Sequence, residues 1–471
     1  MTLFQRQKSV GRDSHLPQYS YLLAFALLLA GCKGIPTKEE KQARSDAQSV
    51  SNLYRPHDEP PRLPELKTDS PFDDYLRFAI LNQPQVEAAY YDWLASIERI
   101  TQQRSLPDPR LTFEMYIQDI ITSIMPGLMM DFPGPGKLPA RARLAAAETE
   151  PKYFVFESSV LQAAFNLKKS FFKLHFLEER IRVNHHSLGL LAELEKLARA
   201  QNEVGKVTLQ DVLRAQIERD RLKTEVANLE DSRNSLLAQF KAALGLRADQ
   251  PTPPVPTRFE SAPLNLSSED LLKAAIERNP RIKGMAAEVR RAEASIALAR
   301  KSRVPDFAAG FEADVKPSPI IWNPQFSMTL PIWRDKIAAE IAEAQAGKRA
   351  TQARLTSEEI ALAVEFAEKS FMYREAARSI SLLQDQLIPK QRQSLEVARS
   401  GYIAGQIDFF NLTDAEQTLL RFSLSEVDAH EQRELALAEL SLMVLGIPPP
   451  GPPFRPFANE PIAHQEHSSN K

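Results

Sequence analysis

Residues 204–215 read VGKVTLQDVLRA, and residues 404–415 read AGQIDFFNLTDA. Each segment has a glycine in its second position, Gly205 or Gly405, and lies between two long stretches whose apolar residues recur at helical spacing. A single glycine at a break between two helical runs predicts a tight helix-turn-helix, because glycine adopts the positive φ that such a turn needs. The chain is therefore expected to contain two long antiparallel helical hairpins.

Further landmarks recur in the same order at nearly the same distance. Leu106-Pro107-Asp108 returns as Val304-Pro305-Asp306, and Leu244-Gly245-Leu246 returns as Leu445-Gly446-Ile447. Within the helical stretches, an offset of 200 pairs Val160, Ala164, Leu167 and Phe171 with Ile360, Val364, Ala367 and Phe371. Ordered landmarks at a constant period indicate an internal duplication. We expect repeat 1 at 68–250 and repeat 2 at 268–450, each a strand hairpin followed by a helical hairpin, with kinks or interruptions at Pro151 and Pro389.

The composition fits long helices and gives no electrostatic case for nucleic acid. The chain has 471 residues, of which 16 are glycine, and a glycine inside a helix costs about 1 kcal/mol relative to alanine. Charged residues make up 25% of the chain, and the formal net charge is -2. A nucleic-acid-binding surface normally needs a clear basic excess, so we expect no nucleic acid as partner.

Each repeat also contains two segments with strand periodicity. In repeat 2 the apolar residues alternate at Phe307, Ala309, Phe311 and Ala313 and again, after a turn at 317–319, from Phe326 to Leu330. One apolar and one polar face is typical of membrane-barrel strands, although a soluble strand hairpin gives the same pattern. Four strands cannot close a barrel, and open edges in lipid leave amides unpaired, so copies must share one barrel. Three copies would supply twelve strands and enclose a water-filled channel, and we therefore expect a homotrimer.

The fold class expected is thus mainly α with a small β part. Duplicated long α-helical hairpins form a coiled-coil barrel, and four strands per chain contribute to a shared trimeric β-barrel. The helical seam repeats every 3.5 residues on average, as coiled-coil packing requires.

The N-terminus has the layout of a secretory signal. Basic residues are followed by a short apolar run and then by Leu29-Ala30-Gly31-Cys32. The run is shorter than the roughly 20 residues that a membrane helix needs. We expect a signal peptide at 1–31, a lipidated N-terminal extended linker at 32–67, a proline-rich connector at 251–267 and a flexible C-terminal tail at 451–471. An ordinary signal peptide with an incidental cysteine is the alternative for Cys32.

Taken together, these features resemble the TolC-like outer-membrane efflux factors over almost the whole mature chain. Leu-Ala-Gly-Cys at 29–32 is similar to a bacterial lipoprotein box, which implies lipidation of Cys32, and Lys33 favours outer-membrane sorting. The junction FPGPGK at 132–137, with its counterpart LPIWR at 330–334, resembles members that serve heavy-metal efflux pumps. The family implies an outer-membrane protein that extends into the periplasm. A periplasmic adaptor (membrane fusion) protein and an inner-membrane efflux transporter load it, and outer-membrane lipid surrounds it.

The same resemblance identifies the two glycine turns as periplasmic helix tips. We expect the tips to dock the adaptor through Val204, Gly205, Lys206, Val207, Ala404, Gly405 and Gln406. The alternative is that these residues only turn the chain. Asp211, Asp408 and Asp414 lie just inside the tips and are candidates for a cation-attracting aperture, although charges near helix ends are usually only solvated. The second tip departs from the first, since Asn411 stands where the first has Asp211.

The residues give no support for catalysis, a cofactor or a metal site. Gly134-Pro135-Gly136-Lys137 lacks the earlier glycine and the Ser or Thr of a phosphate loop. His175, His185 and His186 are not spaced to place two ligands on one helical face. We therefore expect no enzyme, no cofactor and no metal ligands.

The function that the resemblance implies is a passive exit duct of a tripartite efflux pump. Metal ions, drugs and polypeptides are all candidate cargoes, with metal ions favoured by the junction signature. The alternative function is a periplasmic helical-hairpin scaffold or adaptor without a pore.

Overall fold

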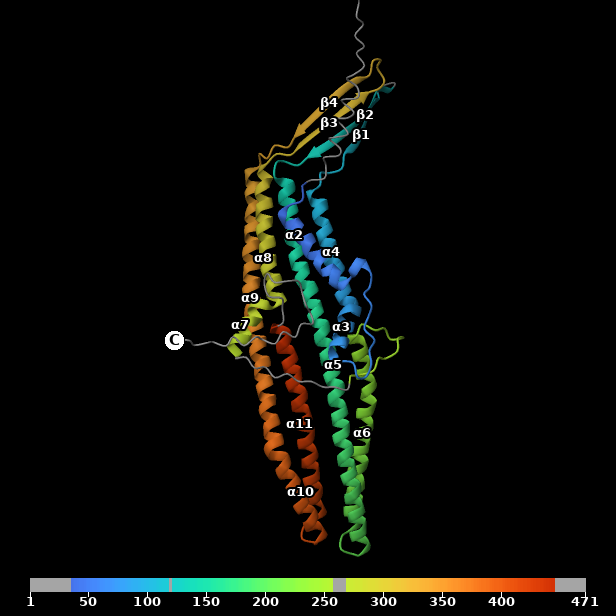
Figure 1. Ribbon diagram of the computed structural model, residues 1–471. Coiled ribbons are helices and arrows are strands. Elements are labelled where there is room, and N and C mark those ends of the chain that lie inside the picture. Colours follow the sequence, from blue (N-terminus) through green and yellow to red (C-terminus); the bar gives the residue numbers. More distant parts are fainter. Residues whose placement is uncertain (1–34, 118–120, 257–267, 445–471) are drawn as a thin grey trace, which may run out of the picture. The chain divides into compact units, whose positions relative to one another are not determined.

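The computed structural model describes residues 35–117, 121–256 and 268–444 of the chain. The expected signal peptide, Cys32, residues 257–267 of the connector and the C-terminal tail lie outside the described residues. The described chain is mainly helical and has one four-stranded antiparallel sheet, which confirms the predicted fold class (Figure 1).

The elements of the two halves follow a similar order. The first half contains α2 (Lys38–Tyr54), η1 (Pro56–Asp58), α3 (Phe72–Asn82), α4 (Pro84–Arg104), β1 (Arg110–Ile117), β2 (Ile121–Phe132), α5 (Lys137–Glu203) and α6 (Leu209–Ala243). The second half contains α7 (Ser268–Arg278), α8 (Pro280–Ala299), η2 (Arg300–Arg303), β3 (Phe307–Asp314), β4 (Ile321–Met328), α9 (Arg334–Leu382), η3 (Leu383–Leu387), α10 (Ile388–Ile403) and α11 (Phe409–Val444). In both halves, two shorter helices (α3 and α4, or α7 and α8) precede a strand pair and a long helical hairpin, and the first half has α2 and η1 in addition.

The chain divides into two compact units, which we describe separately. The strand unit consists of residues up to 44, 95–149 and 290–349, and it contains the whole sheet. The arm unit consists of residues 45–94, 150–289 and 350 onward, and it contains both helical hairpins.

The sheet of the strand unit has one apolar and one polar face. Its strand order is β1-β2-β3-β4, and directly paired residues of an antiparallel sheet lie on the same face. The pairing Leu111↔Leu128↔Phe311 and the pairing Met130↔Ala309↔Phe326 place large apolar side chains in rows across the strands. The other face carries Thr112, Asp131, Glu312, Asn323, Gln325 and Ser327. Many side chains of the apolar face are exposed, with Leu111 at 81% and Phe326 at 82%.

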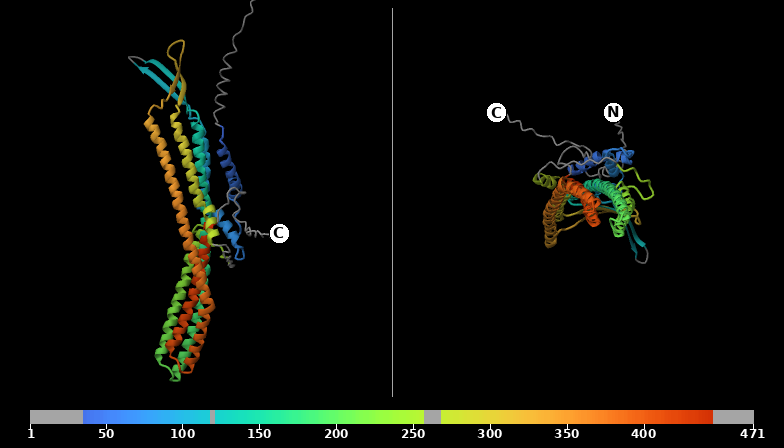
Figure 2. Two further views of the ribbon diagram at one scale, coloured as in Figure 1. Left: turned by 90° about the vertical axis from the view of Figure 1, so that its left-hand side faces the viewer. Right: turned by 90° about the horizontal axis from the view of Figure 1, so that it is seen from below.

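The arm unit contains the two long hairpins that the glycine turns predicted. The pair α5 and α6 and the pair α10 and α11 lie side by side in both side views (Figures 1 and 2). Near the turns, a shared core joins all four helices through Leu194, Ala198, Val212, Tyr402 and Leu412, among others. A second core packs α3 against α5 and α6 around Tyr75, Leu167 and Phe240, and a third packs α7 against α9 and α11.

The two prolines of the long helices behave differently. Helix α5 runs unbroken through Pro151. Before Pro389, by contrast, η3 forms a π-helical turn, and α10 then starts with the proline in its first turn. Proline has no backbone N–H to donate, and a single π-helical turn within an α-helix shifts the register of the hydrogen bonds that precede it. The expected interruption is therefore present at Pro389 and absent at Pro151.

The π turn also refines the alignment of the two halves. Before η3, each buried residue of the first half corresponds to a buried residue 199 positions later, as Leu167 does to Phe366 and Ile181 to Ile380. The sequence comparison had used an offset of 200 there. After η3 the offset is 200, as in Ala198 with Ala398. One additional residue in the π turn accounts for the change.

The segment after Cys32 differs from expectation. Residues 38–54, expected to be extended, form helix α2. The helix has apolar residues facing inward: Tyr54 contacts the rings of Tyr90 and Phe156 at centroid distances of 5.0 and 5.5 Å. None of the helices in the described ranges combines the length and the hydropathy of a membrane span.

Candidate functional site

Both hairpin tips are closed by the same hydrogen-bonding motif. Gly205 and Gly405 have φ of +71° and +74°. At the first tip Gly205 N–H donates to Asn202 and Lys206 N–H to Gln201; at the second, Gly405 N–H donates to Tyr402 and Gln406 N–H to Gly401. These paired bonds are those of a Schellman motif, which ends a helix with one residue of positive φ. The local role of both glycines is therefore to turn the chain.

The space around these glycines is open. A Cβ atom at Gly205 or Gly405 would meet nothing within 4 Å, whereas one at Gly401 would lie 2.6 Å from Ile407 Cδ1. The turn thus needs glycine for its φ alone, and the described residues leave the space beside each glycine open.

The predicted tip residues are almost all exposed. Val204 is 68% exposed, and Lys206, Ala404 and Gln406 are also exposed. Val207 differs, because it is partly buried against the core that the two hairpins share. Further exposed apolar side chains continue from the tips along the helices: Leu209, Leu213, Ile217, Ile403 and Phe410. The tips therefore present exposed apolar side chains together with exposed charged ones such as Glu203, Lys206 and Asp408.

Of the three candidate aperture residues, the structure brings two together. Asp211 is close enough to Asp408 for the two charges to interact, and Asp414 takes no part in this interaction. Burial raises the pKa of Asp211, and Asp408 adds to this rise while Arg214 opposes it. Asp408 has a local role as well, since its Oδ1 accepts the Asn411 N–H at 2.9 Å at the start of α11. Asp414 is exposed.

The first and second tips also touch through side chains that the sequence did not single out. The Arg214 guanidinium of the first hairpin lies 5.8 Å from the centre of the Phe410 ring of the second. The rings of Tyr402 and Phe409, 5.4 Å apart, pack within the second hairpin. Burial, with Asp211 nearby, raises the pKa of Tyr402 to about 12, so this phenol stays neutral. The tips are held together by packing and one cation–π contact.

A buried carboxyl lies between the two hairpins, further from the tips. Glu416 of α11 is 1% exposed and accepts a hydrogen bond from the Ser187 hydroxyl of α5. Its Oε2 atom is buried and has no hydrogen-bond partner among the described residues. Burial raises the pKa of Glu416 to about 7; the Ser187 hydrogen bond lowers it, and Glu218 of α6 raises it. No motif marks this residue, because it is a single acidic position in a helical sequence.

A second missed feature is the clamp at the strand–helix junction. Asp306 Oδ1 accepts the Gly134 N–H at 2.7 Å and the Lys137 Nζ at 2.8 Å. A Cβ at Gly134 would lie 2.2 Å from the Pro305 carbonyl oxygen. In the FPGPGK segment, Gly134 after β2 and Lys137 at the start of α5 therefore both bind Asp306, the residue before β3. Burial alone would raise the pKa of Asp306, but Lys137 and Gly134 outweigh it and hold the pKa below its usual value.

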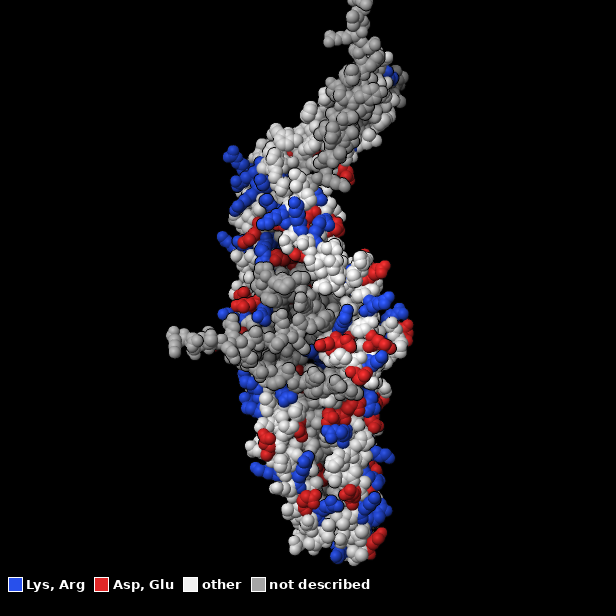
Figure 3. Space-filling model, viewed as in Figure 1, with Lys and Arg blue, Asp and Glu red and all other residues white. Residues whose placement is uncertain are grey.

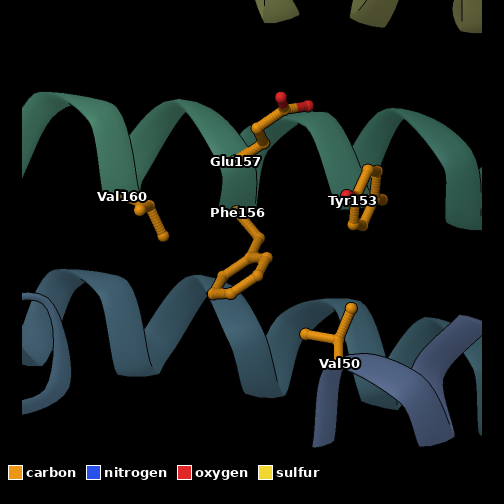
Figure 4. A pocket seen from close by; sticks show the side chains of 5 residues that line it. All are labelled: Val50, Tyr153, Phe156, Glu157 and Val160. Carbon is orange, nitrogen blue, oxygen red and sulfur yellow. The ribbon is translucent and has the colours of Figure 1, made fainter. Parts of the chain in front are cut away.

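The histidines and the cavity offer no binding site. The His175 ring packs 5.1 Å from Phe176, and burial lowers the pKa of this imidazole. Across the described residues, no three His, Cys, Asp or Glu side chains are grouped as metal ligands. Figure 4 shows a hollow lined by Val50 of α2 and by Tyr153, Phe156, Glu157 and Val160 of α5, with a cavity volume of about 10 Å³. That space is close to what one water molecule needs.

Comparison with known proteins relates this chain to outer-membrane efflux proteins. Residues 271–444 match the family model described as outer membrane efflux protein. The chain is 23% identical, over 266 residues, to the cobalt-zinc-cadmium resistance protein CzcC of Cupriavidus metallidurans. The match covers 54% of this chain and 60% of that protein's length.

Solved structures agree with the fold. The CusC structure, in work on transmembrane channel formation, has a TM-score of 0.69 at 15% identity and is matched over 81% of this chain and 94% of that chain. The CmeC outer membrane channel of Campylobacter jejuni has a TM-score of 0.67 at 12% identity, over 81% and 88% of the two chains. The chain thus has the fold of outer-membrane efflux channels. The resemblance to the TolC-like efflux factors, and to their heavy-metal branch, is confirmed by these matches.

The junction clamp gives a first prediction. Replacing Asp306, whose side chain is 39% exposed, by Asn removes the charge opposite Lys137, whose side chain is only 12% exposed. Loss of one partner of such a pair should lower the free energy of unfolding by about 1–3 kcal/mol, measured by thermal unfolding in detergent. Because the folded-state pKa of Asp306 is lowered, this contribution should be present near neutral pH and be lost as the pH falls through the folded pKa.

The matched control for the clamp is Asp131→Asn. This variant breaks the Arg110–Asp131 pair, 2.9 Å long but with side chains 65% and 37% exposed. Exposed pairs contribute about 0–1 kcal/mol, so the control should change stability less. Equal losses in the two variants would contradict the role of the clamp.

Glu416 gives a second prediction, on pH dependence. The folded state keeps its proton up to about pH 7, while an unfolded glutamate loses it near its ordinary value of 4.5. Stability should therefore fall as the pH rises through this window, by a total on the order of 3 kcal/mol at about 1.4 kcal/mol per unit. Glu416→Gln carries no charge and should flatten this fall in the thermal midpoint.

Ser187→Ala is the paired variant for Glu416. It removes the hydrogen bond that favours the ionised carboxylate, so the fall in stability should extend to higher pH than in the parent. The thermal midpoints of the parent and of Glu416→Gln are compared between pH 5 and pH 8. If both change with pH in the same way, Glu416 does not cause the pH dependence and the prediction is refuted.

Proposed function

We propose that this protein is the outer-membrane channel of a tripartite efflux pump and serves as a passive exit duct. The single observation that carries the proposal is the sheet, which has one continuous, exposed apolar face, one polar face and two open edges. The family match over 271–444 and the fold shared with outer-membrane channels support it. The role is one of transport, without catalysis.

The sheet edges support an assembly of several copies. β1 and β4 are the outer strands of the sheet, and in hydrocarbon their unpaired backbone groups would cost several kcal/mol each. Pairing β4 of one copy with β1 of the next satisfies both edges. Three copies place the apolar face toward lipid and the polar face toward a water-filled lumen, which is the homotrimer that the sequence led us to expect.

A second surface supports contacts between copies. On α9, Ile360 is 62% exposed, Val364 is 64% exposed and Phe371 is 51% exposed. Soluble helices normally bury a stripe of this kind. We propose that a neighbouring copy covers it.

We further propose that the chain arose by duplication, with repeats at 68–250 and 268–450. The matching element order, the same motif at Gly205 and Gly405 and the recurrence of buried helix positions at an offset of 199 or 200 support this. For the remaining segments we propose a signal peptide at 1–31, a lipidated linker at 32–67 that includes helix α2, a proline-rich connector at 251–267 and a C-terminal tail at 451–471.

The proposed partners are a periplasmic adaptor and an inner-membrane efflux transporter. The exposed apolar surface of the tips suits docking of an adaptor, and Asp211, Asp408 and Asp414 are proposed to line the entrance. Cys32 is proposed to carry a lipid that anchors the mature chain in the outer membrane, from which it extends into the periplasm. Metal ions are the cargo we favour, because CzcC is named for cobalt, zinc and cadmium resistance.

The assembly gives a third prediction. The mature protein should require detergent for extraction from membranes, elute with the mass of three chains and conduct ions in a planar bilayer. Val364→Lys should weaken the assembly, because it places a charge where a neighbouring copy packs, whereas Gln352→Lys, at an exposed polar position of the same helix, should not.

A scaffold or adaptor without a pore predicts the opposite result. Such a protein would be released by salt or by removal of its lipid. A monodisperse single chain that is stable in plain buffer and does not conduct would refute the channel.

The tips give a fourth prediction, which separates docking from turning. Asn tolerates positive φ, so Gly205→Asn with Gly405→Asn should keep both turns while adding side chains to the open surface. Export, measured as survival on a toxic metal salt in cells with the matching pump, should fall at least tenfold while the trimer still forms.

The control for the tips is Gly189→Asn, an exposed position of α5 where an added Cβ would also meet open space. Full export in the double tip variant would show that the tips serve only to turn the chain.

A further inference from the structure

A cluster of basic residues lies where the sheet meets the helices. Arg300, Lys301 and Arg303 form η2, which precedes β3, and Arg334 and Lys336 begin α9, which follows β4. Two hydrogen bonds join these segments, since Thr329 N–H donates to the Asp306 carbonyl and Asp306 N–H to Thr329 Oγ1, both at 2.8 Å. Figure 3 shows Lys and Arg gathered over the ends of α8 and α9 in this region. We call these five residues the basic collar.

Most charges of the collar have no ion-pair partner among the residues that the structure describes. Arg300, Arg303 and Arg334 are exposed and make no ion pair with any residue in the described ranges. The nearby Asp306 is already bound to Lys137, Lys336 lies 4.0 Å from Glu340, and Asp335 is an exposed carboxylate between Arg334 and Lys336. The five cations thus outnumber the carboxylates beside them that are not already bound to Lys137, and an external anion would relieve the remaining repulsion.

Exposed apolar side chains adjoin the collar on its sheet side. Leu330, Ile332 and Trp333 are 63%, 64% and 71% exposed and lie immediately before Arg334. They continue the apolar face that ends at Phe326 and Met328. An apolar band, then tryptophan, then Lys and Arg is the order found across a membrane–water interface.

We propose that the basic collar binds the phosphate groups of anionic phospholipids at the surface of the membrane that holds the strands. This inference rests on the proposed channel and adds a lipid preference to it. The guanidinium groups of Arg300, Arg303 and Arg334 pair with headgroup phosphates, while Trp333 and Ile332 lie among the adjoining acyl chains. Each cation at an anionic surface should strengthen binding by about fivefold at low salt, and the effect should weaken as salt is added.

The test uses the full mature protein reconstituted into phosphatidylcholine vesicles with or without phosphatidylglycerol. The measurement is the midpoint of heat-induced loss of the assembled trimer. Phosphatidylglycerol should raise this midpoint by several degrees at low salt and by less at high salt. In the variant Arg300→Gln, Arg303→Gln, Arg334→Gln the rise should disappear, while insertion into both kinds of vesicle is kept.

A matched control removes three other exposed cations. Arg221→Gln, Lys223→Gln, Arg392→Gln changes the formal charge by the same amount on α6 and α10 and should keep the full rise. Inorganic phosphate added to phosphatidylcholine vesicles should give no rise, because a free anion lacks the surface that holds several headgroups side by side.

The outcomes separate this inference from the channel itself. Insertion into both vesicles with equal midpoints would overturn the lipid preference and leave the channel standing. A rise that persists in the collar variant, or that inorganic phosphate reproduces, would also overturn it. Failure to insert into either vesicle would overturn both proposals.

Discussion

Backbone hydrogen bonding at the two edges of the sheet is the constraint on which the rest of this protein depends. β1 and β4 each present one row of N–H and C=O groups that has no partner in the four-stranded sheet. In water such edges are tolerated, but in hydrocarbon each unpaired group costs several kcal/mol. A chain whose sheet exposes Leu111, Phe113 and Phe326 on one face can be stable in lipid only when other copies complete the hydrogen bonding. Assembly is then a condition of membrane insertion.

The same constraint explains why the junction between strands and helices is built so firmly. In the proposed assembly, strands that pair with those of neighbouring copies need a firm connection to the helix that follows them. Asp306 supplies it, because one carboxylate binds the Gly134 N–H and the Lys137 ammonium while its backbone pairs with Thr329. Gly134 allows this close approach, since any Cβ there would overlap the Pro305 carbonyl. Beside this clamp, Arg300, Arg303 and Arg334 of the collar make no ion pair with any described residue, which is consistent with a role toward an outside anion.

Much of this could be predicted from the sequence, and what could not has definite physical reasons. The glycine turns were predictable, because positive φ leaves few alternatives to glycine, and the strands were predictable from their alternation. Helix α2 was missed because its polar sequence owes its order to tertiary contacts, such as Glu40 with Arg104 at 3.0 Å. The π turn was missed because Pro389 indicates a defect without saying how the helix accommodates it. Glu416 and Asp306 were missed as partners because a buried contact between distant segments leaves no local pattern.

The equivalent long helices α5 and α9 are covered by different elements in the two halves of the chain, and this difference affects which surfaces are left for contacts between copies. On α5, Phe156 and Phe171 are buried against rings of α2, α4 and α3, including Tyr54, Tyr90 and Phe72. On α9, the second half buries Leu362 and Phe366 under α7, while Ile360 and Val364 on the neighbouring face stay exposed. Exposed apolar side chains remain in the first half too, among them Leu213 and Ile217 of α6, so the difference between the halves is confined to the parts of α5 and α9 beside the short helices. There the described residues of the first half bury Phe156 and Phe171, whereas those of the second half leave Ile360 and Val364 exposed. In the proposed assembly a neighbouring copy covers this stripe, so the divergence of the two halves supports contacts between copies.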